Sequence, residues 1–161
     1  MSVAFRRESD EEHLEPRFEL PIPPGPNLVT ARGLRQIQER NDAIEARLKT
    51  KLPEEERKDV LRDARYWRQR LVSAQVAPTA DGEQVAIGTR VTFVRDGQTR
   101  TIDLVGHDES EPAANRIAFT APLARALAGA GVGDELEFAG SDKPLRVTAI
   151  TVVPDAEEAA S

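Results

Sequence analysis

Residues 30–74 decide the fold, and they read TARGLRQIQERNDAIEARLKTKLPEEERKDVLRDARYWRQRLVSA. Thr30 is a favourable helix N-cap, and Pro53 followed by glutamates is typical of the start of a second helix. Within each predicted helix, apolar residues recur at alternating steps of three and four, and the first series is interrupted by the polar Asn41. They are Leu34, Ile37, Ile44 and Leu48, then Val60, Ala64, Trp67, Leu71 and Ala74. The two seams predict an antiparallel coiled-coil hairpin with arms of about 30 Å.

Beyond residue 86 the apolar period changes to two, which predicts strands. Asp96-Gly97 is a hairpin-turn signal between strands expected at 90–94 and 99–105. Further strands are expected at 116–119, 135–138 and 145–153, with a short helix at 122–128. The predicted fold class is α+β, with the hairpin followed by a small β-rich domain. The predicted segments are a disordered Pro-rich tail (1–27), the hairpin (28–76), a linker (77–86), the C-terminal domain (87–153) and an acidic tail (154–161).

Composition limits the possible functions of the 161-residue chain. There is no Cys and there are only two His, so neither a disulfide framework nor a His-based zinc site is expected. The net charge of −6 is uneven, with 12 Lys/Arg against 8 Asp/Glu over 29–75 and 7 against 11 over 81–153. No secretory signal or membrane span is apparent, so we expect a cytoplasmic protein without membrane contact.

The first candidate site is a cluster of carboxylates at the predicted hairpin tip. These tip acids are Glu54, Glu55, Glu56 and Asp59. Carboxylates on a projecting point could contact Mg²⁺ or position a water molecule, particularly in a metal site of another protein. Alternatively, they only complement the dipole at the start of the second helix.

A second candidate is a set of arginines at steps of three, with Arg70 nearby. This basic stripe comprises Arg62, Arg65 and Arg68, and it could face phosphates. Alternatively, it is a solvated face whose charges pair with Asp59 and Asp63. His107 lies in a Gly-His-Asp-Glu turn, but no nucleophile motif accompanies it, so we expect no enzymatic activity and no cofactor of the chain's own.

Several motifs in the second half resemble the Gre-factor family, which includes GreA and GreB. They are IGTRVT (87–92, against F-G-S-x-V-T), LVGHDE (104–109, against I-V-G-x-D-E), IAFTAPLARALAG (117–129, against I-S-x-x-S-P-[IL]-A-R-A-L-[ILM]-G) and GVGD (131–134, against x-V-G-D). In the first half, LVTARGL (28–34) and SAQV (73–76) resemble the entry and exit of the family's coiled coil.

The resemblance implies a coiled coil followed by an FKBP-like domain, and insertion of the hairpin into the secondary channel of RNA polymerase. Nascent RNA or DNA would be met only within that complex. The implied contacts with polymerase are Thr120, Pro122, Leu123 and Arg125, with Leu123 expected as an exposed apolar anchor. The D-L-S-E-N and A-E-Y tip of cleavage-stimulating members is absent, and the hairpin is about 15 Å shorter.

Two versions of this function stay open: stimulation of transcript cleavage, and channel occupation without cleavage, as in short-hairpin relatives such as Rnk. A prolyl isomerase is a further alternative, because the implied fold is FKBP-like, but it would need a pocket lined with aromatic residues. The third alternative is a coiled-coil adaptor for an unrelated partner.

Overall fold

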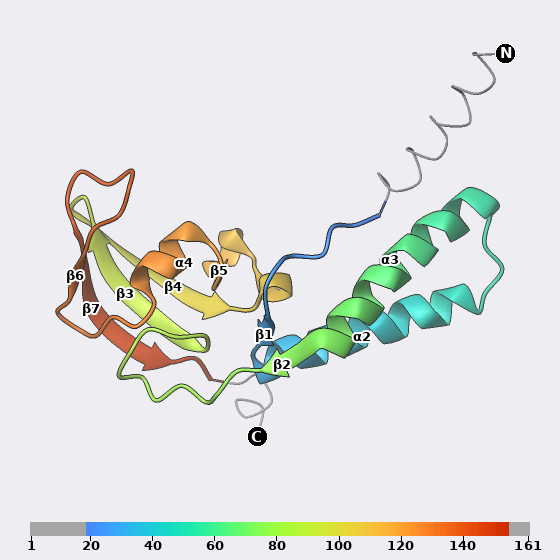
Figure 1. The fold of residues 1–161 in the computed structure, drawn as a ribbon, viewed down its shortest axis with the longest axis horizontal. Coiled ribbons are helices and arrows are strands. Elements are labelled where there is room, and N and C mark those ends of the chain that lie inside the picture. The colour runs from blue at the N-terminus through green and yellow to red at the C-terminus, as the bar shows by residue number, and fades with distance from the viewer. Residues whose placement is uncertain (1–18, 155–161) are drawn as a thin grey trace, which may run out of the picture. The chain divides into compact units, whose positions relative to one another are not determined.

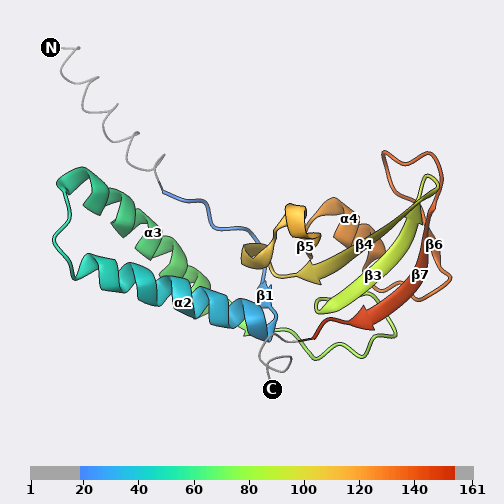
Figure 2. The same ribbon diagram turned by 180° about the vertical axis from the view of Figure 1, so that it is seen from behind.

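The computed structural model describes residues 19–154 and divides the chain into two compact units. Figures 1 and 2 draw the chain from opposite sides. Within the described residues, the hairpin unit comprises residues 19–25 and 38–72, and the sheet unit comprises residues 26–37 and 73–154. The predicted mixture of helices and sheet is confirmed. The expected disordered tail falls largely, and the expected acidic tail almost wholly, outside the described residues.

Two antiparallel helices dominate the hairpin unit (Figure 1): α2 (Ala31–Leu48), whose first two turns belong to the sheet unit, and α3 (Glu54–Ser73). Ion pairs Arg47–Glu56 and Arg68–Glu45 join the two helices. Val60 and Ala64 are buried, as the seam pattern predicted, and the Arg40 guanidinium lies 4.9 Å from the centre of the Trp67 ring. Apolar contacts and cross-helix charges together hold the hairpin.

The turn between the helices is capped at both of its ends. Arg57 Nη1 donates to the Leu48 carbonyl at 3.3 Å, which occupies one of the free carbonyls at the end of α2. Thr50 Oγ1 donates to the Arg47 carbonyl at 2.7 Å. On the other side, the Arg57 amide closes the first turn of α3 on the Pro53 carbonyl at 2.8 Å, as expected for proline at a helix start.

The sheet unit is built on five strands in the order β5-β4-β3-β7-β6. Their bounds are β3 (Thr89–Arg95), β4 (Gln98–Val105), β5 (Arg116–Ala118), β6 (Glu135–Leu136) and β7 (Leu145–Val152). β3 and β4 meet at Asp96 and Gly97, whose φ angles of 49° and 81° are those of a tight hairpin turn. The remaining elements are the short helix α4 (Pro122–Leu127) and the 3-10 turns η1 (His107–Glu109) and η2 (Pro112–Ala114).

One hydrophobic core serves this sheet. Ala124 and Leu127 of α4 pack with the buried faces of β3, β4 and β7, around the fully buried Phe93. Val85 belongs to the same core, and its amide donates to the Ala130 carbonyl at 2.9 Å. Residue 85 was predicted to lie in a linker, so the structure extends the domain further towards the N-terminus than the sequence suggested.

A second, two-stranded sheet was not predicted. β1 (Asn27–Val29) pairs in parallel with β2 (Ala74–Val76). Asn27 had been placed in the tail, and residues 28–29 and 74–76 in the coiled coil. Parallel strands of three residues, far apart in the chain, carry no turn signal and too few residues to show a period. Within residues 19–154, no helix is both long enough and apolar enough to span a membrane.

Candidate functional site

The tip acids are exposed, and their carboxylates are not gathered around one point. Glu54, Glu55 and Glu56 form the first turn of α3. Glu56 pairs with Arg47, and Glu55 lies 3.6 Å from Lys58. Among residues 19–154, no group of three or more His, Cys, Asp or Glu side chains is placed to hold a metal ion. The tip therefore offers carboxylates to a partner but no preformed metal site.

Each arginine of the basic stripe has an acidic partner. Arg62 donates to Asp63 at 3.2 Å, Arg65 pairs with Glu19, and Arg68 pairs with Glu45 across the hairpin. The hydrogen bond from Arg68 lowers the pKa of Glu45, and that from Arg65 lowers the pKa of Glu19. The predicted pairing with Asp63 is present, whereas the partners of Arg65 and Arg68 lie far away in sequence.

Arg70 does not belong to this exposed set. It is only 2% exposed, although the sequence had grouped it with the other arginines. Five residues beyond Arg65, it lies on another side of α3, and helix periodicity alone could have placed it there.

The predicted polymerase-contact residues lie at and just before α4. Thr120, Pro122 and Arg125 are exposed. Leu123, however, is partly buried and packs against the sheet core. The prediction that Leu123 is an exposed apolar anchor is therefore wrong. Leu123 helps Ala124 and Leu127 of the same short helix to cover the core, so its side chain is not free to project. A contact here would rest mainly on Arg125, together with the exposed Thr120 and Pro122.

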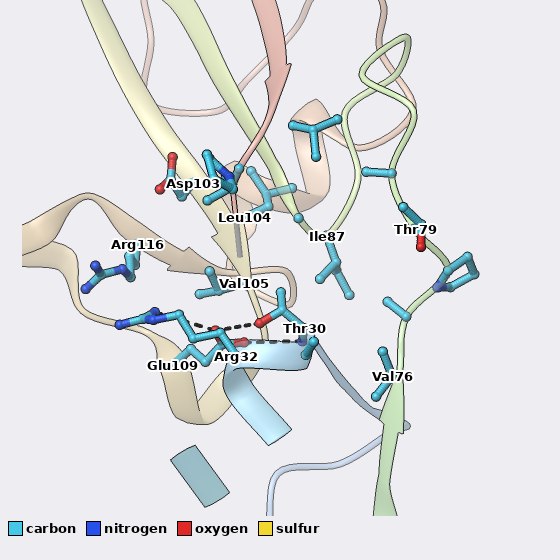
Figure 3. Close-up of a pocket in the computed structure, with 18 residues that line it drawn as sticks. Thr30, Arg32, Val76, Thr79, Ile87, Asp103, Leu104, Val105, Glu109 and Arg116 are labelled. Atoms are coloured by element: carbon cyan, nitrogen blue, oxygen red, sulfur yellow. Dashed lines mark hydrogen bonds and ion pairs between the residues drawn. The ribbon is translucent and has the colours of Figure 1, made fainter. Parts of the chain in front are cut away.

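One side chain of the sheet unit that makes several hydrogen bonds had not been singled out from the sequence. Glu109, at the end of η1, is 6% exposed. Its Oε1 accepts from the Thr30 hydroxyl at 2.7 Å, and its Oε2 accepts from the amides of Gly106 at 3.2 Å and Thr30 at 3.4 Å. Arg32 Nη1 lies 3.7 Å from Glu109 Oε1. Figure 3 shows the side chains of Thr30, Arg32 and Glu109 converging at the start of α2.

Two glycines make this junction possible. A Cβ on Gly33 would lie 2.2 Å from Glu109 Oε2, and a Cβ on Gly106 would lie 2.6 Å from the Leu28 carbonyl oxygen. The Gly33 amide in turn donates to Thr30 Oγ1 at 3.0 Å, which confirms the predicted N-cap. The TARG and GHDE segments therefore fit together as one buried hydrogen-bonded joint. We call Thr30, Gly33, Gly106 and Glu109 the cap joint.

A cavity of about 210 Å³ opens beside the cap joint (Figure 3). One wall is mainly apolar, with Val76, Ile87 and Val152, and the other carries charged side chains. These charges are already paired: Asp103 accepts from Arg90 at 2.8 Å, and Arg116 donates to Glu111 at 2.7 Å. No aromatic residue lines the cavity, and Phe93 is wholly buried. The aromatic pocket that a prolyl isomerase would need is absent from this cavity.

Comparison with known proteins identifies the class of the C-terminal region. Residues 79–153 match the family model described as "Transcription elongation factor, GreA/GreB, C-term". A sheet domain that carries these motifs is a Gre-type C-terminal domain. The resemblance to the Gre-factor family that was read from the sequence motifs is confirmed by this match over residues 79–153.

Two transcription elongation factors of known sequence align with this chain over a length similar to that of the family match. Transcription elongation factor GreA 1 of Lactiplantibacillus plantarum is 34% identical over 90 residues, 55% of this chain and 58% of that protein. GreB of Neisseria meningitidis serogroup A is 37% identical over 83 residues, 49% and 51% respectively. The chain thus spans only about half the length of the curated relatives it matches.

Solved structures give weaker similarities. GreA factor homolog 1 (Gfh1) of Thermus thermophilus aligns with 79% of this chain and 99% of its own, at 17% identity and a TM-score of 0.38. A GreA/GreB factor from Nitrosomonas europaea covers 77% and 98%, at 18% identity and a TM-score of 0.39.

Proposed function

We propose that this chain is a transcription elongation factor that binds RNA polymerase and inserts its helical hairpin into the secondary channel. One observation carries the proposal: a Gre-type C-terminal domain stands in the same chain as two antiparallel helices that turn at a group of exposed carboxylates. The finer description is part of the proposal, with an antiparallel coiled coil in the hairpin and an FKBP-like arrangement in the sheet domain. RNA and DNA would be met only within the polymerase complex, in the cytoplasm.

The chain would act on the polymerase without an active site or cofactor of its own. In the first version, the tip acids would help to hold a second Mg²⁺ in the polymerase. The ion would activate water for hydrolysis of a phosphodiester of a backtracked transcript, in which a P–O bond to water forms as the P–O bond to the leaving oxygen breaks. In the alternative, the hairpin occupies the channel as a regulator and no cleavage follows.

Capture of core polymerase tests the binding step. Arg125→Glu should weaken capture at least about tenfold, equivalent to about 1.4 kcal/mol. Arg100→Glu makes the same charge change at an exposed position of β4 and is the matched control. Equal capture by both variants would place the contact elsewhere, and failure of the unaltered chain to capture polymerase would favour the adaptor alternative.

Stalled polymerase complexes test the tip. Replacing Glu54, Glu55 and Glu56 by Gln keeps the side-chain shape but removes the charge that attracts Mg²⁺. The triple variant should lose its effect on backtracked complexes and still bind polymerase. A control variant with Gln at Glu83, Glu135 and Glu137, which are exposed acids of the sheet unit, should keep both properties. Transcript length in the same assay distinguishes cleavage from regulation without cleavage.

A further inference from the structure

The basic stripe on α3 is partly covered by the chain's own N-terminal segment. Arg65 Nε donates to Glu19 Oε2 at 3.1 Å, and Arg65 Nη2 pairs with the other carboxylate oxygen, Oε1. The contact is therefore bidentate. Glu19 stands 46 residues before Arg65 in the chain, so this pair is a tertiary contact and not a consequence of helix spacing.

A guanidinium binds a phosphate through the same two-pronged arrangement with which Arg65 binds Glu19. Arg62 lies one turn earlier on α3, and its charge adds to the attraction that lowers the pKa of Glu19. In this position the Glu19 carboxylate stands where a phosphate oxygen pair would bind. Arg68 is different, because its partner Glu45 belongs to the hairpin itself and joins α2 to α3.

The segment that carries Glu19 is suited to holding it in place. Pro21, Pro23, Pro24 and Pro26 follow within seven residues and restrict the backbone to extended conformations. A chain that is already extended loses little conformational entropy when its end is held, so a single side-chain contact can keep it in place.

We propose that residues 19–25 form an autoinhibitory strap, in which the Glu19 carboxylate occupies Arg65 in place of a phosphate of single-stranded RNA. RNA that reaches the basic stripe displaces Glu19, and Arg65 and Arg62 then contact the phosphate backbone. The choice of RNA as the partner rests on the proposed function. The occupation of Arg65 rests on the geometry of the Glu19 contact alone.

The strength of the contact sets the size of the effect. Glu19 and Arg65 side chains are 47% and 53% exposed, so their ion pair belongs to the weak, solvent-screened class. A mask of this kind lowers the affinity for RNA by about two- to fivefold and does not abolish binding. The strap would thus favour a partner that presents several phosphates at once over small anions in solution.

Binding of a fluorescently labelled single-stranded oligouridylate by the purified full chain, followed by anisotropy at low salt, tests the strap. Glu19→Gln should bind about two- to fivefold more tightly than the unaltered chain. Glu39→Gln, which removes the same charge from an exposed position of α2, controls for net charge. Arg65→Gln should weaken binding, and adding Glu19→Gln to it should give no more than the change seen with Glu39→Gln.

Three results would overturn the strap. The first is an equal gain in RNA affinity for Glu19→Gln and Glu39→Gln. The second is a gain in RNA affinity from Glu19→Gln that persists when Arg65 is replaced by Gln. The third is tighter capture of polymerase by Glu19→Gln without any change in RNA binding. The third result would mean that Arg65 contacts a surface of the polymerase protein and not RNA. Because the RNA assay contains no polymerase, its outcome is independent of the capture experiment that tests the proposed function.

Discussion

Removing the Glu109 carboxylate should destabilise the sheet unit more than removing any exposed acid. In Glu109→Ala, the amides of Gly106 and Thr30 lose their acceptor, and the Thr30 hydroxyl loses the partner at 2.7 Å. The substitution also leaves a void, because Glu109 is 6% exposed and its side chain fills the space against Gly33.

The magnitude follows from these contacts. A buried amide left without an acceptor costs about 1–3 kcal/mol, and hydrogen bonds to a carboxylate contribute about 1.5–3 kcal/mol each without being additive. Some of the loss returns when water enters the space beside the neighbouring cavity. We therefore expect a loss of about 2–4 kcal/mol for Glu109→Ala and about 1–2 kcal/mol for Glu109→Gln, whose amide oxygen can still accept from the two backbone amides.

Native-state hydrogen exchange at amides of the sheet core, such as those of Val91 and Ile102, measures the free energy of opening of this unit. Glu111→Ala is the matched control, because Glu111 has a 60% exposed side chain and pairs only with Arg116 among the contacts described for it. That change should cost less than about 1 kcal/mol. A loss no larger for Glu109→Ala than for Glu111→Ala would refute the view that the cap joint stabilises the unit.

The remaining predictions concern the same joint, the hairpin and the separate domain. Gly33→Ala should destabilise the chain despite the better helix propensity of Ala, because its Cβ would meet Glu109 Oε2. In a Glu109→Ala background, the same change should be neutral or stabilise by up to about 1 kcal/mol. Denaturant unfolding of the unaltered chain, the two single variants and the double variant measures this difference. The Glu45 carboxyl should titrate below its ordinary pKa of 4.5 in an NMR experiment, since its hydrogen bond with Arg68 lowers the pKa. The stability that this pair contributes is present above pH 4.5 and is lost as the pH falls through the lowered pKa. Arg68→Gln should move the titration midpoint of Glu45 upwards. The fragment 81–153 retains the buried core residues from Val85 to Val147 and should unfold cooperatively, though with lower stability than the full sheet unit, because it lacks Thr30 as the partner of Glu109; a fragment without a thermal transition would contradict this.

Local signals in the sequence were sufficient for the helices and the main sheet. The Thr30 cap, the Pro53 start and the Asp96-Gly97 turn each act through their immediate neighbours, and the structure contains all of them. β1 and β2 escaped prediction because their pairing joins residues 47 positions apart, as in Asn27 with Ala74. Such a contact is decided by tertiary packing, which no local period reports.

The candidate sites divide in the same way. The sequence placed the tip acids and the basic stripe on α3, but it could not show that Glu19 contacts Arg65. The position of the buried Arg70 away from the stripe could have been predicted from helix periodicity. The cap joint was also missed, although its parts were visible as the TARG and GHDE segments. A glutamate four residues after the end of a buried strand, in a turn that begins with a glycine, is a signal that a search for buried acids could use.

The residues that identify this family and the residues that would decide its activity are different ones. Thr30, Gly33, Gly106 and Glu109 lie within the motifs of the resemblance, and in the structure they form hydrogen bonds or close contacts with one another. Their role is therefore in the fold, and a fold by itself does not fix the activity that it carries. The tip acids are exposed, and the contacts described for them are surface ion pairs, such as that of Glu56 with Arg47, which contribute little to stability. Activity at the tip can therefore change without loss of the fold, which is why the Gln substitutions at Glu54, Glu55 and Glu56 separate binding from action on the transcript.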